Sequence, residues 1–406
     1  MSLGPVLALS VSAAVVMLGF GLIMPFLPVY AQLLGAASGV DIGILSSAFL
    51  VTRTLLATPA GSFSDRLGRK RIIVVGLALY SILSVMFAFA STWVELIMFR
   101  ALQGVASAMV WPASTALVAE MSIPERRGTA MGVFNSVSMS GWMVGPALGG
   151  AIQWYSRNAL GMGLLDSFRT PFYASALLSL ASMVLVVLLV RGTKISEPRS
   201  RSLVLPTKAI DPKFRRTVYA LLFLLISYGF ATSFVEPMLV YFVQHEYSLS
   251  EDAVVSNMAV IFTMSGMIML CTQLLGGRIA DRYSKKGTIV STSMVAQALT
   301  IAMPFSRDVG EIGSVMVARS AFYGLGSPAY TAFQQNLLPS NVRGTLTGLF
   351  DTAFGFGAFA GPIVGFLLYD TISHSSPFLA SGLLGIATLV AIVLFTYEPK
   401  REEIPA

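Results

Sequence analysis

The segment GSFSDRLGRKR at residues 61–71 holds five charged residues in eleven positions. One apolar stretch ends just before it, near Pro59, and another begins just after it, at Ile72. A related segment, GGRIADRYSKKG, occurs at residues 276–287. A dense charged segment between two apolar stretches is typical of a short loop at a membrane surface, and its return predicts an internal repeat.

The composition around this segment is that of a membrane protein. Of the 406 residues, 55% are hydrophobic and only 12% are charged, whereas soluble domains carry about 25% charged residues. A soluble helical bundle is excluded, because it could not bury so many apolar faces. Apolar runs of about 20 residues, the length that crosses the hydrocarbon core of a bilayer, recur along the chain. We therefore predict an all-α membrane protein with twelve transmembrane helices, at residues 5–32, 42–63, 72–91, 94–119, 127–153, 170–191, 217–243, 253–279, 287–306, 310–336, 344–369 and 376–397.

Lysine and arginine residues are distributed unevenly between the predicted loops. Of the 27, 21 lie in the loops of one side and in the C-terminal tail, whereas the other side holds only Arg157, Arg169 and Arg307. The positive-inside rule then places both termini in the cytoplasm and the chain in the cell membrane. A nucleic-acid partner is not expected, because the basic residues are spread over many loops rather than gathered on one face.

The two charged segments align at an offset of 216 residues, which places Asp65 over Asp281. The same offset places residues 127–150 over residues 343–366, with five coincident glycine and proline positions. The chain is therefore expected to consist of two homologous halves. Parallel repeats of this kind are typical of transporters, whose substrate site lies between the halves near the middle of the membrane.

The repeat also predicts the domain limits. Residues 1–191 form an N-terminal six-helix bundle, and residues 192–216 form a basic cytoplasmic linker. Residues 217–406 form a second six-helix bundle with a short cytoplasmic tail. The expected fold is a pair of pseudo-symmetric bundles.

Four motifs together resemble the major facilitator superfamily and, within it, the twelve-helix drug:proton antiporters. The loop segment fits the family pattern G-x-x-x-D-R-x-G-R-K-R, and the glycines from Gly132 to Gly150 fit the antiporter pattern G-x8-G-x3-G-P-x-x-G-G. LIMFRALQGVASA at 96–108 and LGFGLIMPFLP at 18–28 fit the patterns of the fourth and first helices. The resemblance covers nearly the whole chain and implies antiport by alternating access of a central pocket.

The charged loop and its copy are candidate gating elements. The resemblance implies that Asp65 lies at the interface of the halves and interacts with the positive N-terminus of the helix that begins near Gly344. Anchoring of the loop to anionic headgroups by its basic residues is the alternative. The gating candidates are Gly61, Asp65, Arg66, Gly68 and Arg69, with Asp281 and Arg282 in the copy, where Ser284 replaces the loop glycine.

Three glycines of the fifth predicted helix form a second gating candidate. Gly141, Gly145 and Gly149 are spaced by four residues, so they lie on one face and permit close approach of a neighbouring backbone. Pro146 removes a backbone hydrogen bond and favours a kink. A tight contact there could seal one side of the pocket, and ordinary helix packing is the alternative.

Five ionisable residues fall inside the predicted spans, where charge is costly and usually functional. They are Arg53, Arg100, Glu236, Arg319 and Asp351. Arg53 and Asp351 each lie about 10–12 Å from the cytoplasmic end of their helices. The resemblance implies that these helices face each other, so we predict an Arg53–Asp351 contact that forms and breaks during transport.

Two further features concern proton coupling. Asp351 stands where the first half has Asn135, so this acid is not shared by the repeat. Glu236 lies at a depth similar to Arg100 and Arg319, and it is expected to pair with one of them. Burial disfavours the charged form of a carboxylate and an adjacent arginine favours it, so such a site could load and release a proton. A static ion pair is the alternative.

The expected substrate is a small amphipathic molecule. Aromatic residues such as Trp142, Tyr228 and Tyr323 are placed on the predicted cavity helices and suit promiscuous binding. Three intramembrane arginines against two acids leave the spans positive, which opposes a simple cation exporter and allows an organic anion.

We therefore predict a proton-coupled exporter of drug-like molecules. The alternative is a carrier of an organic anion, sugar or lipid-like metabolite whose arginines bind the substrate, and a membrane receptor on the same scaffold is a third hypothesis. An enzyme is not expected, because no nucleophile–base or metal-ligand spacing occurs. The expected partners are a small-molecule substrate, protons and the lipid bilayer. We expect a monomer with no cofactor or metal, driven by the proton gradient.

Overall fold

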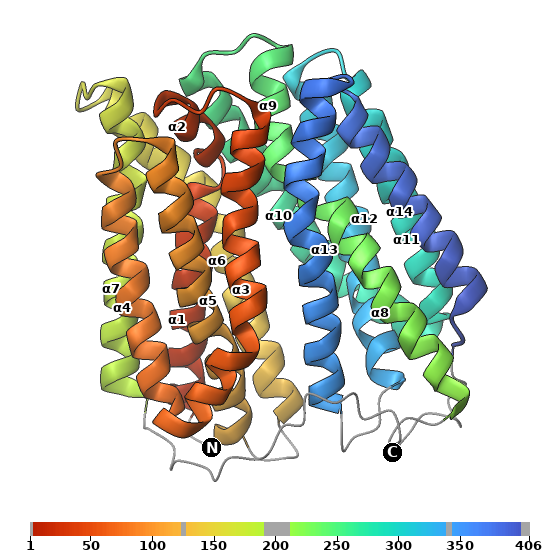
Figure 1. Cartoon of the computed structure of the whole chain (residues 1–406). Coiled ribbons are helices and arrows are strands. Elements are labelled where there is room, and N and C mark those ends of the chain that lie inside the picture. Colours follow the sequence, from red (N-terminus) through yellow and green to blue (C-terminus); the bar gives the residue numbers. More distant parts are fainter. Residues whose placement is uncertain (1–2, 123–126, 191–211, 338–342, 399–406) are drawn as a thin grey trace. The chain divides into compact units, whose positions relative to one another are not determined.

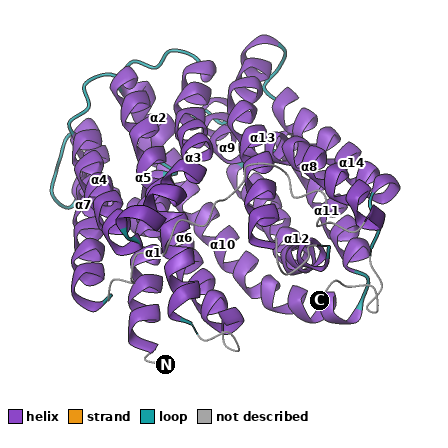
Figure 2. Cartoon of the chain, turned by 60° about the horizontal axis from the view of Figure 1, so that its bottom comes forward, coloured by secondary structure: helices purple, strands orange, loops and turns teal. Residues whose placement is uncertain are grey.

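The computed structural model describes residues 3–122, 127–190, 212–337 and 343–398, and nearly all of them are helical (Figures 1 and 2). No strand occurs in these four ranges. Residues 192–211 of the predicted linker and residues 399–406 of the predicted tail lie outside the described residues.

The first six predicted spans correspond to seven helices. They are α1 (Leu3–Ile23), α2 (Leu27–Leu33), α3 (Gly39–Leu67), α4 (Arg69–Ala88), α5 (Trp93–Met121), α6 (Arg127–Asn158) and α7 (Leu164–Leu189). The bent pair of α1 and α2, with an angle of 49° at its break, makes one span. The break contains Pro25, which has no backbone N–H to continue the helical ladder.

The last six predicted spans correspond to seven α-helices and one 3-10 turn. They are α8 (Pro212–Ser233), α9 (Val235–Glu246), α10 (Glu251–Arg282), α11 (Lys285–Ala302), η3 (Met303–Phe305), α12 (Val309–Asn336), α13 (Arg343–Thr371) and α14 (Ser376–Phe395). Here α8 continues into α9 and α11 into η3, so each pair makes one span.

The twelve predicted membrane-spanning helices are confirmed in the described part of the chain. Nine spans are apolar enough by composition to cross a membrane, and the bent α1–α2 pair makes a tenth. The other two, α6 and α12, have 32 and 28 residues and are rich in glycine and serine. Each exceeds the length of about 20 residues that a bilayer requires.

Side-chain caps begin α5 and α12 at equivalent positions of the repeat. The Thr92 hydroxyl accepts a hydrogen bond from the Glu95 backbone N–H (3.4 Å), and the Asp308 carboxylate accepts one from the Glu311 N–H (2.8 Å). Each glutamate in turn accepts a hydrogen bond from the N–H preceding the cap, at 2.9 and 2.8 Å. The cap oxygens satisfy N–H groups that the first helical turn leaves free.

The chain separates into two compact units. Unit 1 comprises Met1–Ser200 and Val243–Thr263, and unit 2 comprises Arg201–Phe242 and Met264–Ala406. The helix α10 therefore begins in unit 1 and ends in unit 2. The domain limits that the repeat predicts, at residues 191 and 217, stay a prediction.

In unit 1, α6 packs against α1 through the predicted glycine face. A methyl group at Gly145 would lie 2.8 Å from the Leu18 carbonyl oxygen, and one at Gly141 or Gly149 would meet other α1 carbonyl oxygens still more closely. Only glycine permits this approach of the two backbones. The proline at position 146 lies inside a continuous α6.

In unit 2, α13 packs against α8 in the same way. A methyl group at Gly361 would lie 2.6 Å from the Phe230 carbonyl oxygen, and one at Gly357 would approach the Ile226 carbonyl oxygen of α8 still more closely. A methyl group at Gly365 would lie 2.6 Å from the ring of Phe234, which lies between α8 and α9. These two glycine-mediated contacts lie at equivalent places of the repeat, while the gating role of the glycines in α6 stays a prediction.

At one neighbouring contact, the small and the larger residue exchange helices between the units. A methyl group at Gly76 of α4 would lie 2.6 Å from Cγ2 of Val110 in α5. In unit 2 the same two positions hold Thr292 of α11 and Gly326 of α12, and a methyl group at Gly326 would lie 2.5 Å from the Thr292 hydroxyl. The small residue is on the first helix of the pair in unit 1 and on the second helix in unit 2.

Candidate functional site

Arg100 lies on α5 in the interior of unit 1, where only 6% of it is exposed. Its guanidinium carbon lies 4.8 Å from the centroid of the Phe20 ring and 5.2 Å from that of Phe49. One terminal nitrogen donates a hydrogen bond to Oε1 of Gln103 (3.0 Å), and the buried Nε has no partner among the described residues. Two rings therefore stabilise the charge of a guanidinium that keeps an unused donor.

Two more side chains extend this group into an arginine–aromatic cluster, which consists of Phe20, Phe49, Arg53, Arg100 and Trp142. The Trp142 ring stacks on Phe20 with centroids 5.2 Å apart and planes at 26°. The guanidinium of Arg53 lies 6.0 Å from the Phe49 centroid. Among the described residues of unit 1, no acidic side chain forms an ion pair with Arg53 or Arg100.

Arg319 is a buried arginine on α12 of unit 2, one helical turn from Met316, which stands at the repeat position equivalent to Arg100. It is 5% exposed, its Nε donates to the Thr300 hydroxyl (3.0 Å), and its guanidinium lies 4.7 Å from the centroid of Tyr323. The Tyr323 hydroxyl accepts a hydrogen bond from Gln297 Nε2 (3.0 Å). The predicted site residues Arg319 and Tyr323 are thus in contact, within a polar group that also includes Thr300 and Gln297.

Glu236 lies in the first turn of α9, in unit 2, and is partly buried. No ion pair within 4.0 Å joins it to Arg319 among the described side chains. Tyr228 of α8 lies near Phe354 of α13, with ring centroids 6.2 Å apart. The predicted pairing of Glu236 with an arginine therefore stays a prediction.

Some predicted pairings join residues of different units. Arg53 belongs to unit 1 and Asp351 to unit 2, and the same holds for Arg100 and Glu236. These contacts stay predictions. Asp351 and its first-half counterpart Asn135 are both exposed in the structure.

The charged loop forms an ion-pair network inside unit 1. Arg69 contacts Asp65 at 3.1 Å and Glu120, near the end of α5, at 2.8 Å. Gly68 joins α3 to α4 with φ of +95°, a conformation that favours glycine. Gly61 and Arg66 lie near it, and the Asp65 contact with the helix starting near Gly344 stays a prediction.

The copy of the loop in unit 2 is built differently. The described residues contain no ion pair of Asp281 or Arg282. Ser284, which replaces the loop glycine, caps α11 by accepting a hydrogen bond from the Gly287 N–H (2.9 Å). The Glu398 carboxylate also accepts a hydrogen bond from the Lys285 N–H (2.7 Å). The acid that stabilises this turn therefore comes from the end of the chain rather than from the loop.

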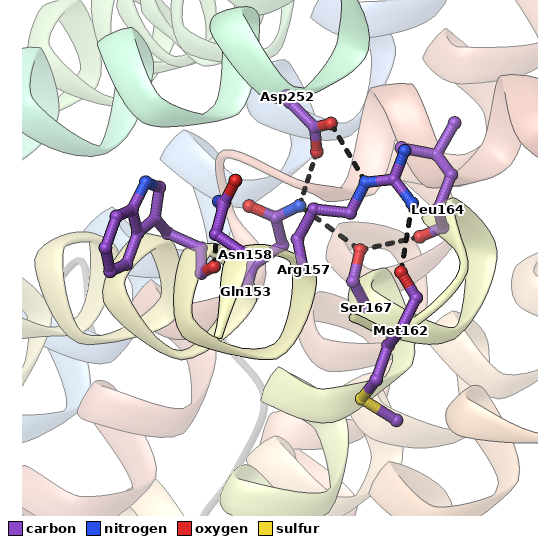
Figure 3. A network of polar contacts seen from close by, with 8 residues as sticks. Gln153, Arg157, Asn158, Met162, Leu164, Ser167 and Asp252 are labelled. Carbon is purple, nitrogen blue, oxygen red and sulfur yellow. Dashed lines mark hydrogen bonds and ion pairs between the residues drawn. The ribbon is translucent and has the colours of Figure 1, made fainter. Parts of the chain in front are cut away.

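A polar network that the sequence did not predict joins α6, α7 and the start of α10 within unit 1 (Figure 3). The Asp252 carboxylate accepts a hydrogen bond from Gln153 Nε2 (2.6 Å) and forms an ion pair with Arg157 Nε (3.4 Å). Gln153 Nε2 also lies 3.2 Å from the Ser167 hydroxyl, and Arg157 donates to the Met162 carbonyl (2.9 Å). We refer to Gln153, Arg157 and Asp252 as the α6–α10 network.

Comparison with known proteins places the chain in a family. The family model described as Major Facilitator Superfamily matches residues 9–362 and 221–406. Multidrug resistance protein 2 of Bacillus subtilis (strain 168) is 28% identical over 385 residues, covering 92% of this chain and 91% of the relative. Quinolone resistance protein NorA of Staphylococcus aureus (strain MRSA252) is 24% identical over 391 residues, covering 96% of each.

A solved structure shares the fold. The crystal structure of the nucleoside transporter NupG superposes with a TM-score of 0.75 at 15% identity, covering 98% of this chain and 100% of that one. At this identity the likeness concerns the fold alone.

Proposed function

The chain belongs to the major facilitator superfamily of membrane transporters, and we propose that it is a proton-coupled exporter of small amphipathic molecules. It is a multi-pass membrane carrier and not an enzyme. In our proposal it lies in the cell membrane as a monomer with both termini in the cytoplasm, and the proton gradient drives export by alternating access.

The observation that carries the proposal is the presence of an acid and a buried arginine on membrane-spanning helices of unit 2. Arg319 is almost fully buried and Glu236 is partly buried. The absence of a direct ion pair between these two described side chains leaves the carboxylate able to take up a proton without first losing a salt-bridge partner. Glu236 is the proton carrier in this proposal, and Asp351 is the second candidate.

The relatives and the aromatic side chains support the substrate class. Two of the similar proteins are named for resistance to multiple drugs and to quinolones. The predicted pathway contains Trp142, Tyr228 and Tyr323, which offer flat apolar faces to a planar molecule.

Alternating access requires contacts that open and close. The α6–α10 network joins α6 to the part of α10 that belongs to unit 1. It lies on the side that the distribution of basic loops assigns to the exterior. We propose that this network closes that side of the pocket and opens when substrate leaves.

The test is transport by the full chain in liposomes under an imposed pH gradient, with a quinolone as the probe. The expected result is quinolone-dependent proton flux in the wild type, loss of that flux in Glu236→Gln and retention of it in Glu251→Gln. Glu251 is a matched control, because it is an acid in the first turn of α10 and is not among the predicted pathway residues. Flux that persists unchanged in Glu236→Gln would contradict the assignment of the proton carrier.

A carrier of organic anions that ignores the pH gradient is the second candidate. It is favoured by the two arginines of unit 1 that form no ion pair among its described residues. Anion flux that is independent of the gradient and lost in Arg100→Ala would support it.

A further inference from the structure

We propose that the arginine–aromatic cluster is a binding site for a planar aromatic anion, whose ring stacks on Phe20 and Trp142 and whose acidic group pairs with Arg100. This inference rests on the proposed transport function, but it does not depend on proton coupling. It concerns unit 1 alone.

The first argument is that the Arg100 guanidinium has unused hydrogen-bond donors. A guanidinium has five N–H donors in its plane and none on its faces. The two rings of Phe20 and Phe49 lie over the group, so they leave the in-plane donors unsatisfied. One donor reaches Gln103, and the buried Nε has no partner among the described residues.

The second argument is the absence of a competing acid. A buried charge is costly unless it is paired and hydrogen-bonded. Within the described part of unit 1, neither Arg100 nor Arg53 forms an ion pair. In unit 2, by contrast, the Nε of the buried Arg319 donates a hydrogen bond to the Thr300 hydroxyl. Of these two buried arginines, therefore, only Arg100 has an Nε without a hydrogen-bond acceptor among the described residues.

The third argument is the shape of the surroundings. Phe20 and Trp142 are stacked at 5.2 Å and both are partly exposed, whereas Phe49 is buried. A ligand therefore approaches along the Phe20 and Trp142 side, where a flat ring can extend the stack. A carboxylate or sulfonate on that ring can then accept two parallel hydrogen bonds from Arg100. Arg53, also partly exposed, adds a second positive charge near the entrance.

The test compares three ligands that share one ring and differ in charge. They are 2-naphthoate (anionic), 2-naphthamide (neutral) and 2-naphthylmethylammonium (cationic). Binding to the purified full chain is measured by quenching of Trp142 fluorescence, which the Trp142→Phe variant separates from the signal of the other tryptophans. We expect 2-naphthoate to bind at least about tenfold more tightly than either analogue, which matches the usual strength of a hydrogen bond to a charged group.

Substitutions locate the effect. Arg100→Gln is expected to weaken 2-naphthoate binding at least about tenfold and to leave 2-naphthamide binding nearly unchanged. Arg100→Lys keeps the charge but loses the paired hydrogen-bond geometry. Its affinity for 2-naphthoate is expected to lie between those of the wild type and Arg100→Gln. Arg169→Gln is the matched control, because Arg169 is an arginine of unit 1 whose partner is Asp166. A thermal melt of each variant identifies those that do not fold.

The outcomes separate this inference from the proposed function. Cation binding as tight as anion binding in the wild type would overturn the inference, whatever the variants do. So would 2-naphthoate binding that is unaffected in a folded Arg100→Gln. Arg100-dependent binding of 2-naphthoate without proton flux in liposomes would refute proton coupling and leave the anion site standing. Proton flux driven by a quinolone, with no preference for the anionic naphthalene in binding, would refute the anion site and leave proton coupling standing.

Discussion

The Nε atom of Arg157 lies 3.4 Å from Oδ2 of Asp252, so an ion pair fastens the start of α10 to the end of α6. Gln153 adds a hydrogen bond of 2.6 Å to the other carboxylate oxygen. The two charged side chains are 38% and 39% exposed, and pairs as accessible as this contribute only about 0.2–1 kcal/mol. A contact of this strength can hold one conformation and still be broken during each transport cycle.

Removing one charge should therefore favour separation of α10 from α6. Asp252→Asn keeps an acceptor for Gln153 and loses the ion pair. We expect the separated population to rise about 1.4- to 5-fold, from the weak strength of such pairs. The measurement is the labelling rate of Ala259→Cys, which is buried here, by a thiol reagent in a Cys271→Ser background. Glu251→Gln should leave the rate unchanged, and an equal rise in that control would contradict the role of the pair.

A covalent link at the same contact should arrest transport. A Cβ atom placed on Gly150 would lie 2.7 Å from the Cβ of Ala259, and a disulfide needs about 3.5–4.5 Å between these atoms. A small separation of the helices is therefore enough for Gly150→Cys and Ala259→Cys to form a bond. We expect oxidation to stop quinolone flux and reduction to restore it. Each single variant, in the Cys271→Ser background, should be insensitive to oxidant. Full flux with a quantitatively formed disulfide would show that α6 and α10 need not separate there.

Alanine in the glycine face of α6 should destabilise the protein. The added methyl group of Gly145→Ala would lie too close to the backbone of α1, and overpacking of this kind costs about 1–3 kcal/mol. Gly132→Ala is a matched control on the same helix, because a Cβ there meets nothing within 4 Å. It should be neutral or slightly stabilising, since alanine suits a helix better than glycine. Melting temperatures in detergent give the comparison, and equal values for the two variants would argue against a tight α1–α6 contact.

The predicted contact between Arg53 and Asp351 is tested by exchanging the charges. We expect Arg53→Asp and Asp351→Arg each to lose most transport, because each leaves two like charges at the contact. The double variant should recover a measurable part of the flux. Asn135→Asp, which places an acid at the equivalent position of the first half, is the control and should not rescue Arg53→Asp. No recovery in a double variant that folds would rule out the pairing.

The span assignments could be predicted from the sequence because the length of an apolar run is a local property. The first residue of a helix is harder to predict where charged residues form its first turn. The sixth span was predicted to begin at residue 170, but α7 begins at Leu164. Its first turns contain Asp166 and Arg169, which form an ion pair of 3.1 Å. Hydropathy excludes these residues, although an acid near a helix N-terminus favours the helix.

The partners of the charged residues could not be predicted in the same way. The motif identified Asp65 and Arg69, but it did not identify Glu120, which lies about fifty positions further on. Asp252 belongs to none of the motifs and directly precedes the span predicted at residues 253–279. Such contacts depend on the rotation and depth of packed helices, and apolar periodicity does not determine these when most faces are apolar.

The small residue of the α4–α5 contact is Gly76, opposite Val110, whereas the small residue of the equivalent α11–α12 contact is Gly326, opposite Thr292. This difference limits how segments of the two halves can be exchanged. Grafting the Thr292 residue alone onto position 76 would set its side chain against Val110, since even a methyl group there lies 2.6 Å from Cγ2. Moving both members of a pair together would preserve the fit. In a chimaera of the two halves, α4 and α5 must therefore be exchanged together. The helix pair, rather than the single helix, is the smallest interchangeable module of this scaffold.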